Sequence, residues 1–270
     1  MNILLCGDVV GRPGRDAAKA YLARLRQDLA LDVVVVNAEN AAHGFGLTEK
    51  ICGELYDAGA DVLTTGNHVW DQREIIPYLG RDPRVLRPAN FPPGTPGEGS
   101  YRYRLADGRS VLVVNLMGRL FMEALDDPFR ALDAVLAGQG LGGGAAIVVD
   151  FHAEATSEKT AFGHFADGRV SAVIGTHTHV PTADTQILSG GTAYVSDIGM
   201  CGNYDSVIGM DKVAAVRRFV TRVPDKKPQV AEGDATLCGV FVVIDDASGL
   251  ARRIEPVRLG GRLAPCVPLP

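Results

Sequence analysis

The stretch Val-Val-Val-Val-Asn-Ala-Glu-Asn occupies residues 33–40 and decides the fold class of the chain. Four consecutive valines predict a β-strand whose two faces are both buried, which is typical of a parallel or mixed sheet between helix layers. One carboxylate and two amides follow the valines directly. In α/β sheets, ligands bind beyond the carboxyl ends of the strands. This stretch therefore predicts both a buried strand and a polar site at its end.

Further apolar runs predict strands throughout the chain, and most of them alternate with helical patterns. Strands are expected at 3–6, 33–36, 61–64, 101–105, 111–115, 145–151, 170–174, 237–244 and 253–257. Helices are expected around 18–29, at 48–59, at about 71–79, and after Asp127 and Asp211. Asp107-Gly108 predicts a hairpin turn between two of the strands. We therefore predict one α/β domain over residues 1–270, with either two packed sheets or one large mixed sheet.

The composition is that of an ordinary soluble protein, with 46% hydrophobic and 22% charged residues among 270. No apolar run approaches about 18 residues, so the sequence predicts no membrane span. The first residues read as a strand and not as a signal peptide. Five widely spaced cysteines without a CxxC pair are typical of reduced thiols, so we expect a cytoplasmic protein.

The charge pattern argues against broad electrostatic binding to nucleic acid, because the net charge is −5. The densest basic cluster follows the helical pattern opened by Asp211 and consists of Arg217, Arg218, Arg222, Lys226 and Lys227. Cations suit the negative end of a helix dipole, so we interpret this cluster as a solvated helix end.

Ligand-type side chains follow five of the predicted strands, at the point where each strand ends. They are Asp8, Glu39, Asn40, Asn67, His68, His152, His177 and His179. Taken singly, an aspartate or asparagine at such a position is more often a turn or cap residue, and a histidine is more often a satisfied core or surface residue. The joint placement at strand ends favours a common site. By contrast, His43 and His164 are expected in glycine-rich surface loops.

The chemistry of this set points to a metal centre. Oxygen and nitrogen ligands without thiolates favour Mn, Fe or Zn over a structural zinc bound by cysteines. Eight ligand-type groups are too many for one tetrahedral ion. A carboxylate shared between two ions would account for the excess.

Six motifs make the chain resemble the YmdB-like branch of the calcineurin-like metallophosphoesterase superfamily. They are Asp-Val-Val-Gly-Arg-Pro-Gly-Arg at 8–15, Asn-Ala-Glu-Asn at 37–40, Gly-Asn-His-Val-Trp at 66–70, His-Ala-Glu-Ala-Thr-Ser-Glu-Lys at 152–159, Gly-Thr-His-Thr-His-Val-Pro-Thr-Ala-Asp at 175–184 and Asp-Ile-Gly-Met at 197–200. The resemblance runs from residue 2 to about 258. Three positions depart from the wider superfamily: Val10 replaces a metal-binding histidine, Glu39-Asn40 replaces the bridging aspartate motif, and Val69 replaces an acidic residue.

The resemblance implies a fold and a ligand set. The fold would be a metallophosphoesterase-like β-sandwich of mixed sheets flanked by helices, in α/β/β/α layers. One metal ion would be held by Asp8, Glu39, Asn40 and His179, and the other by Glu39, Asn67, His152 and His177, with Glu39 bridging. The ions would be Fe or Mn, with Zn as an alternative. His68 would face the substrate and either hydrogen-bond the phosphate or protonate the leaving oxygen.

The resemblance also implies a phosphodiesterase that acts on 2′,3′-cyclic nucleotides. Two divalent ions could share a water and lower its pKa, so that a bridging hydroxide attacks the phosphorus. Asn115 and the segments 116–123 and 199–209 are either contacts of the nucleoside or ordinary loop and strand ends. The alternatives are a phosphomonoesterase with the same site, a regulatory module that binds nucleotides or RNA ends with weak turnover, and a mononuclear amidohydrolase. Since many enzymes are symmetric oligomers, a homo-oligomer is also considered.

Overall fold

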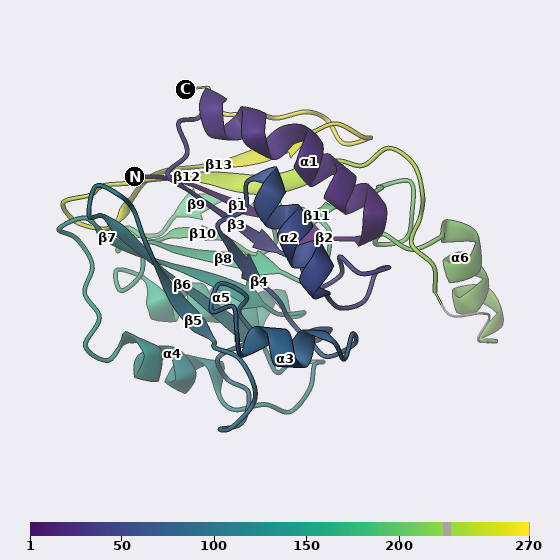
Figure 1. The fold of residues 1–270 in the computed structure, drawn as a ribbon, viewed down its shortest axis with the longest axis horizontal. Coiled ribbons are helices and arrows are strands. Elements are labelled where there is room, and N and C mark those ends of the chain that lie inside the picture. Colours follow the sequence, from purple (N-terminus) through teal and green to yellow (C-terminus); the bar gives the residue numbers. More distant parts are fainter. Residues whose placement is uncertain (224–227, 270) are drawn as a thin grey trace.

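The computed structural model describes residues 1–223 and 228–269, and it contains two large mixed sheets packed face to face (Figure 1). The five-stranded sheet has the order β13-β12-β1-β3-β4, formed by β1 (Asn2–Cys6), β3 (Val33–Asn37), β4 (Val62–Thr64), β12 (Leu237–Ile244) and β13 (Ala251–Leu259). The six-stranded sheet has the order β5-β6-β7-β8-β10-β9, formed by β5 (Ser100–Arg104), β6 (Ser110–Met117), β7 (Ala145–His152), β8 (Ala172–Thr176), β9 (Gln186–Ile187) and β10 (Ala193–Val195). Two short strands, β2 (Asp8–Val9) and β11 (Met200–Cys201), pair with each other. Of the two arrangements predicted, the structure has two packed sheets.

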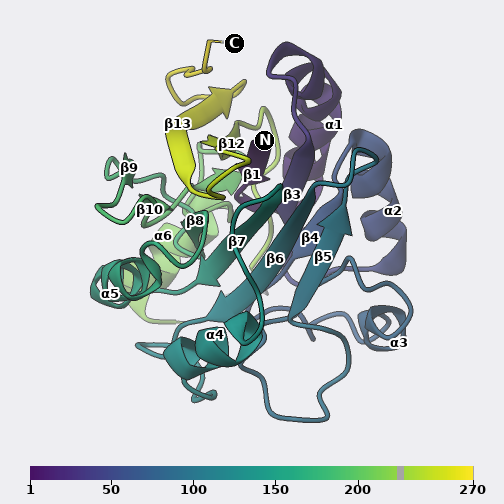
Figure 2. The same ribbon diagram turned by 90° about the vertical axis from the view of Figure 1, so that its left-hand side faces the viewer.

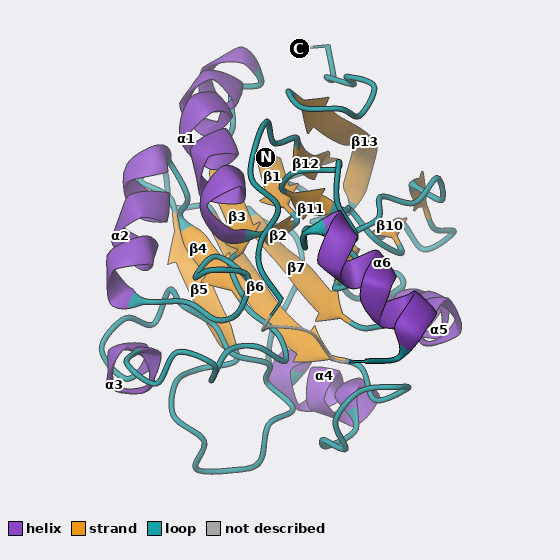
Figure 3. Ribbon diagram, turned by 90° about the vertical axis from the view of Figure 1, so that its right-hand side faces the viewer, coloured by secondary structure: helices purple, strands orange, loops and turns teal. Residues whose placement is uncertain are grey.

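Helices cover the outer faces of both sheets (Figure 2). The helices are α1 (Gly11–Asp28), α2 (Glu49–Ala58), α3 (Ile75–Leu79), α4 (Pro128–Leu136), α5 (Thr156–Ala166) and α6 (Lys212–Thr221). Figure 3 shows α1 and α2 on one side of the strands and α5 on the other. The fold is therefore of the mixed α/β class. None of the helices in the described ranges is long and apolar enough to cross a membrane.

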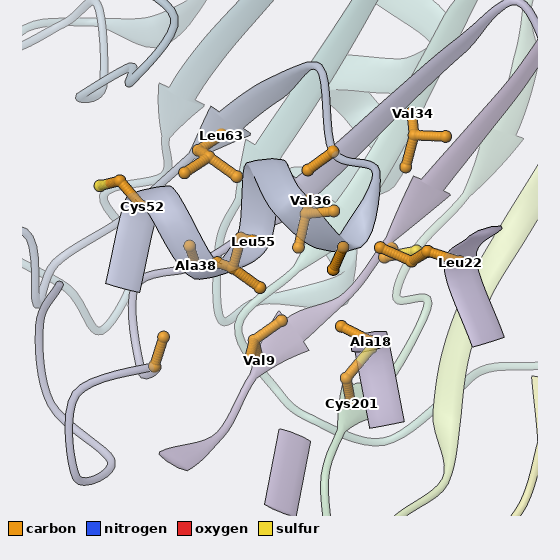
Figure 4. Packing of buried hydrophobic residues seen from close by; sticks show 14 of the residues in the cluster. Val9, Ala18, Leu22, Val34, Val36, Ala38, Cys52, Leu55, Leu63 and Cys201 are labelled. Carbon is orange, nitrogen blue, oxygen red and sulfur yellow. The ribbon is translucent and has the colours of Figure 1, made fainter. Parts of the chain in front are cut away.

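The valine run of β3 contributes to two different cores, because successive side chains of a strand point to opposite faces. Val34 and Val36 pack against residues of α1 and α2, among them Leu22 and Leu55 (Figure 4). Val33 and Val35 face the second sheet. All four valines are at most 2% exposed. This double burial is the reason that the run is apolar throughout, as a strand between a helix layer and a second sheet requires.

The six-stranded sheet also has two buried faces, one against the first sheet and one against helices α4 and α5. Val111 and Val113 of β6 point into the core between the sheets. Leu112 and Val114 point outward and pack in a third cluster with Leu132 of α4 and with residues of α5. Helices, sheet, sheet and helices thus share three continuous buried clusters.

Most of the predicted elements are present near the expected bounds. The hairpin β5–β6 is antiparallel and turns at Gly108, whose φ of 93° suits glycine. Thr48 caps α2 by accepting a hydrogen bond from the Ile51 amide, and Gly59 ends the helix in a left-handed conformation. Asp211 caps α6 through the Ala214 amide. Lys226 and Lys227 of the predicted basic cluster lie outside the described residues.

Two expectations were wrong in part, and one helix was not predicted. The helix expected at about 71–79 is shortened to α3, since its first half forms turns such as the one closed by the Ile75 amide on the Gln72 carbonyl. Helix α5 was not predicted, because its buried face includes Glu158 and Lys159, which interrupt the apolar pattern. His164 consequently lies on α5 and not in a loop, although it is exposed as expected.

Candidate metal centre

The structure brings the predicted ligand residues to one rim, where strands of both sheets end. Asp8 lies on β2, His152 is the last residue of β7, and the others lie in the loops after β3, β4 and β8. The ligand atoms of Asp8, Glu39 and His179 lie within 4.8 Å of one another, and so do those of Glu39, His152 and His177. Glu39 belongs to both groups. The two sheets therefore contribute to a single cluster that has one shared carboxylate.

Nε2 of His152 lies at the centre of the group formed by Glu39, His152 and His177. It is 3.1 Å from Oε1 of Glu39, 3.1 Å from Oδ1 of Asn67 and 3.0 Å from Nδ1 of His177. His152 is fully buried and Glu39 is 1% exposed. Three potential electron-pair donors thus surround a fourth, at a place where His152 and Glu39 are buried and His177 is partly exposed.

Hydrogen bonds on the far side of each ring fix these nitrogen atoms. The Thr176 hydroxyl donates to Oδ1 of Asp150 at 2.6 Å, so it accepts from Nδ1 of His152 at 2.8 Å. Nε2 of His177 lies 3.3 Å from Oε2 of Glu154, which favours a proton on that nitrogen. Nε2 of His152 and Nδ1 of His177 are therefore the ring atoms available to a ligand. Such second contacts orient the histidines of metal sites.

The other group, formed by Asp8, Glu39 and His179, surrounds the carboxylate of Asp8, which is fully buried. Nδ1 of His179 donates to the Ile208 carbonyl at 2.8 Å, so Nε2 presents its lone pair to Oδ1 of Asn40 at 3.2 Å and to Oδ1 of Asp8 at 3.9 Å. The Asn40 amide nitrogen donates to the Gly44 carbonyl at 2.9 Å, which directs its oxygen inward. Oδ1 of Asp8 has no hydrogen-bond partner. A buried carboxylate oxygen without a partner is costly, and a cation would satisfy it.

Without metal ions, burial and mutual charge shift the pKa values of the clustered residues far from their ordinary values. Burial raises the pKa of Asp8 to about 6. Burial also opposes ionisation of Glu39, but the charge of His152 and its hydrogen bond outweigh this and hold the Glu39 pKa at about 2. The same pairing overcomes the burial of His152 and raises its pKa to about 9. Burial and the neighbouring His152 lower the pKa of His177 to about 3. One proton on His152 serves Glu39 alone, whereas a metal ion would serve all the acceptors.

The backbone is shaped around the cluster. A Cβ atom on Gly66 would lie 2.3 Å from Nε2 of His152 and 2.4 Å from Oε2 of Glu39, so only glycine fits there. His177 and His179 have φ angles of 100° and 66°, a left-handed region that non-glycine residues seldom adopt. Backbone strain of this kind concentrates at functional sites.

A family model described as YmdB-like protein matches residues 4–257. The chain belongs to the YmdB-like family. A Bacillus subtilis (strain 168) protein named 2′,3′-cyclic-nucleotide 2′-phosphodiesterase is 50% identical over 257 residues, which are 95% of this chain and 96% of that protein. A solved structure of a hypothetical protein from Thermus thermophilus has a TM-score of 0.90 and 42% identity, covering 97% of this chain and 100% of that one. The structure of a novel phosphatase from Mycoplasma pneumoniae has a TM-score of 0.89 and 34% identity, covering 96% and 93%.

In this member of the YmdB-like family, His68 stands beside the ligand cluster. Its amide donates to Oε2 of Glu39 at 3.1 Å, while its ring is 28% exposed. Nδ1 lies 2.8 Å from Oδ2 of Asp71, and the ring meets Phe45 edge-on at a centroid distance of 5.1 Å. With Nδ1–H donated to Asp71, Nε2 is free for another partner. Asp71 was not predicted, although its spacing of three residues from His68 was a signal.

Other functional residues were missed because they lie inside predicted strands or helices. Asp150 accepts hydrogen bonds from Thr176, Thr64 and Asn37 beneath the cluster. An aspartate in a valine-rich strand is a signal that could have found it, since a buried carboxylate needs partners.

The expectation for Asn115 was wrong. The residue is fully buried, and its oxygen accepts a hydrogen bond from the Thr65 amide at 3.1 Å, so it supports the loop after β4. The segments 116–123 and 199–209 do reach the rim, since the Gly118 amide donates to the His152 carbonyl and Ile208 bonds His179.

Proposed function

We propose that this phosphoric ester hydrolase is a dinuclear-metal phosphodiesterase whose substrates are 2′,3′-cyclic nucleotides. The observation that carries the metal centre is the position of Nε2 of His152, within 3.1 Å of three other acceptors from Glu39, Asn67 and His177. A cation satisfies this arrangement best. The substrate class is supported by the name of the Bacillus subtilis relative, which shares half of its residues with this chain.

In the proposed centre, Glu39 is the shared ligand of two ions. Asp8, Asn40 and His179 would complete one ligand set, and Asn67, His152 and His177 would complete the other. Nitrogen and oxygen ligands of this kind suit Mn, Fe and Zn, and we propose Fe or Mn. The partnerless Oδ1 of Asp8 supports the first set. Two carboxylates against two divalent ions leave a positive site, which fits a phosphate ester bound by an acidic protein.

When bound, the two ions would lower the pKa of a water and neutralise charge on the phosphate. The water oxygen is added to phosphorus, one ribose P–O bond breaks, and the released ribose oxygen takes a proton. His68 is positioned to donate that proton from Nε2, because Asp71 holds Nδ1 and orients the ring. The ribose oxygen remains tethered to the product, a nucleoside monophosphate. The 116–123 and 199–209 segments are the proposed contacts of the nucleoside.

The test is a metal analysis of the purified protein together with a substrate panel. A 2′,3′-cyclic nucleotide, its two monophosphates and a linear phosphodiester are compared at equal concentration. We expect about two ions per chain and fastest turnover of the cyclic nucleotide. Faster release of phosphate from the monophosphates would favour a phosphomonoesterase instead. Turnover no faster than that of a His68→Ala variant would favour a module that binds nucleotides or RNA ends.

We further propose that residues 1–270 act as one domain, supported by the buried cluster that both sheets share. The five cysteines all lie in the described ranges and are all free, which supports work in a reducing compartment.

A further inference from the structure

The turn that carries two of the proposed ligands is strained. His177 and His179 have positive φ angles of 100° and 66°, and Thr178 lies between them. Neither histidine is free of the steric clash that glycine avoids, so the surrounding structure must hold the turn in this conformation. The contacts of its peptide groups show which residues do so.

Lys159 and Asp197 form a buried ion pair against this turn. Each side chain is 1% exposed, and Nζ of Lys159 lies 2.8 Å from Oδ2 of Asp197. Nζ also donates to the Thr176 carbonyl at 2.8 Å, at the start of the turn. Oδ2 of Asp197 accepts a hydrogen bond from the Thr178 amide at 3.0 Å. The pair therefore hydrogen-bonds the backbone immediately before His177 and again between the two histidines.

The remaining contacts place the pair in context. The His177 amide donates to Oδ2 of Asp8 at 3.2 Å, and the Tyr204 hydroxyl donates to the His179 carbonyl at 3.2 Å. Asp8 is itself a proposed ligand, so its hold on the turn changes when an ion binds. Lys159 and Asp197 are not ligands. Their hydrogen bonds to the turn are present in the metal-free protein.

The charges of the pair argue for a role beyond filling the core. Burying an ammonium and a carboxylate carries a desolvation penalty, and apolar residues of similar volume often serve packing as well or better. Lys159 also interrupts the apolar face of α5. Asp197 uses its second oxygen to accept from the Gly199 amide at 2.8 Å, so the pair ties α5, the end of β8 and the 197–199 segment together.

We propose that Lys159 and Asp197 are positioning residues, which hold the His177-Thr178-His179 turn in its left-handed conformation and so preorganise both metal ions' histidine ligands. The inference rests on the proposed metal centre. It assigns the pair no contact with substrate. Each ion is affected, because His177 and His179 belong to different ligand sets.

The test is a titration of the metal-free protein with Co²⁺, followed by visible absorption, in Lys159→Met, Asp197→Asn and the double variant. Contacts that orient metal ligands typically contribute about 10–100-fold to metal affinity, so each single variant should bind Co²⁺ about that much more weakly. At saturating Co²⁺, the visible spectrum should also differ from wild type, because the ligand geometry has relaxed. The loss in the double variant should be smaller than the sum of the two single losses, since Lys159 and Asp197 are paired with each other.

The matched control is Arg26→Met, which breaks an ion pair between α1 and Asp61 at the opposite end of β4 from His68. It should lower the melting temperature and leave the Co²⁺ affinity and spectrum unchanged. If Lys159→Met does not fold, Asp197→Asn, which preserves shape, decides the question alone. Wild-type affinity and spectrum in the folded variants would overturn the positioning role while leaving the metal centre intact. A wild-type protein that binds no Co²⁺ would overturn both.

Discussion

Nε2 of His152 lies 3.0 Å from Nδ1 of His177, and the two nitrogen atoms face each other across the candidate site. Each ring is bonded on its other nitrogen, His152 to the Thr176 hydroxyl and His177 to Glu154. Nε2 of His152 also lies 3.1 Å from Oε1 of Glu39, so in the proposed centre a metal ion would take the place of the proton that joins these residues in the metal-free cluster. The predictions below follow from placing metal ions there.

Glu39→Gln should reduce the metal content below two ions per chain. The glutamine has nearly the same shape, but it lacks the charge that both ions would share, so both should bind more weakly. The measurement is elemental analysis of protein purified with and without added Mn²⁺. Glu98→Gln, at an exposed carboxylate outside the proposed site, should behave as wild type. Two tightly bound ions and full activity in the Glu39 variant would refute the bridging role.

His68→Ala should retain the metal ions and lose about 10²–10⁴-fold in kcat, as expected for removal of a general acid. The metal ions should remain because the backbone amide of His68, not its ring, bonds Glu39, while the ring bonds Asp71. The measurement is steady-state hydrolysis of a 2′,3′-cyclic nucleotide, with metal content determined in parallel. His164→Ala, at an exposed residue of α5, is the control. Loss of metal in the His68 variant would instead make its ring a ligand.

Gly66→Ala should disrupt the site although it adds one methyl group. That methyl carbon would lie 2.2 Å from Cδ2 of His152 and 2.4 Å from Oε2 of Glu39, so both side chains must move. Metal content and turnover should fall together. Gly53→Ala on α2 is the matched control, because its added carbon meets nothing within 4 Å. Normal metal binding in Gly66→Ala would show that the loop can shift without cost to the site.

Asp8→Asn should stabilise the metal-free protein near pH 7.5 while weakening metal binding. Burial raises the pKa of Asp8 from 3.8 to about 6, so the folded state holds the proton more tightly than the unfolded state does. Above pH 6 the folded protein carries a buried carboxylate at a cost of about 3 kcal/mol, which asparagine removes.

The sign of the pH dependence follows from the same shift. As pH falls from 6 towards 4, Asp8 becomes protonated in the folded wild type, and the advantage of the asparagine should disappear. Thermal unfolding of both metal-free proteins at pH 4, 6 and 7.5 tests this. A variant less stable than wild type at pH 7.5 would mean that the carboxylate is already compensated without an ion.

Much of the fold could be predicted from the sequence, because burial on two faces leaves a simple pattern. Val33 to Val36 are apolar in succession since they serve two cores. Helix α5 left no such pattern, because Glu158 and Lys159 on its buried face bond the Arg119 amide and Asp197 instead of packing as apolar residues. The buried face of α5 is stabilised by these hydrogen bonds, which do not appear in the periodicity of hydrophobic residues.

The candidate site divides in the same way. Residues at or just beyond the ends of strands, such as His152 and Asn67, could be predicted because the ends of strands meet at one rim. Asp150 could not, since it lies within β7 and acts from beneath the cluster. Which polar residues in a strand face a site depends on the register between β7 and β8, where Asp150 lies opposite Ile174 and His152 opposite Thr176. That register is set by the packing of the whole sheet.

The most direct test of the account is a crystal structure of the protein soaked in Mn²⁺, with the ions located by anomalous scattering. We expect two anomalous peaks about 3.5–4 Å apart, the spacing usual for two-metal phosphoesterase sites. One peak should contact Asp8 and His179, the other His152 and His177, and Glu39 should contact both. A single peak, or two peaks that Glu39 does not join, would contradict the dinuclear centre on which the proposed function depends.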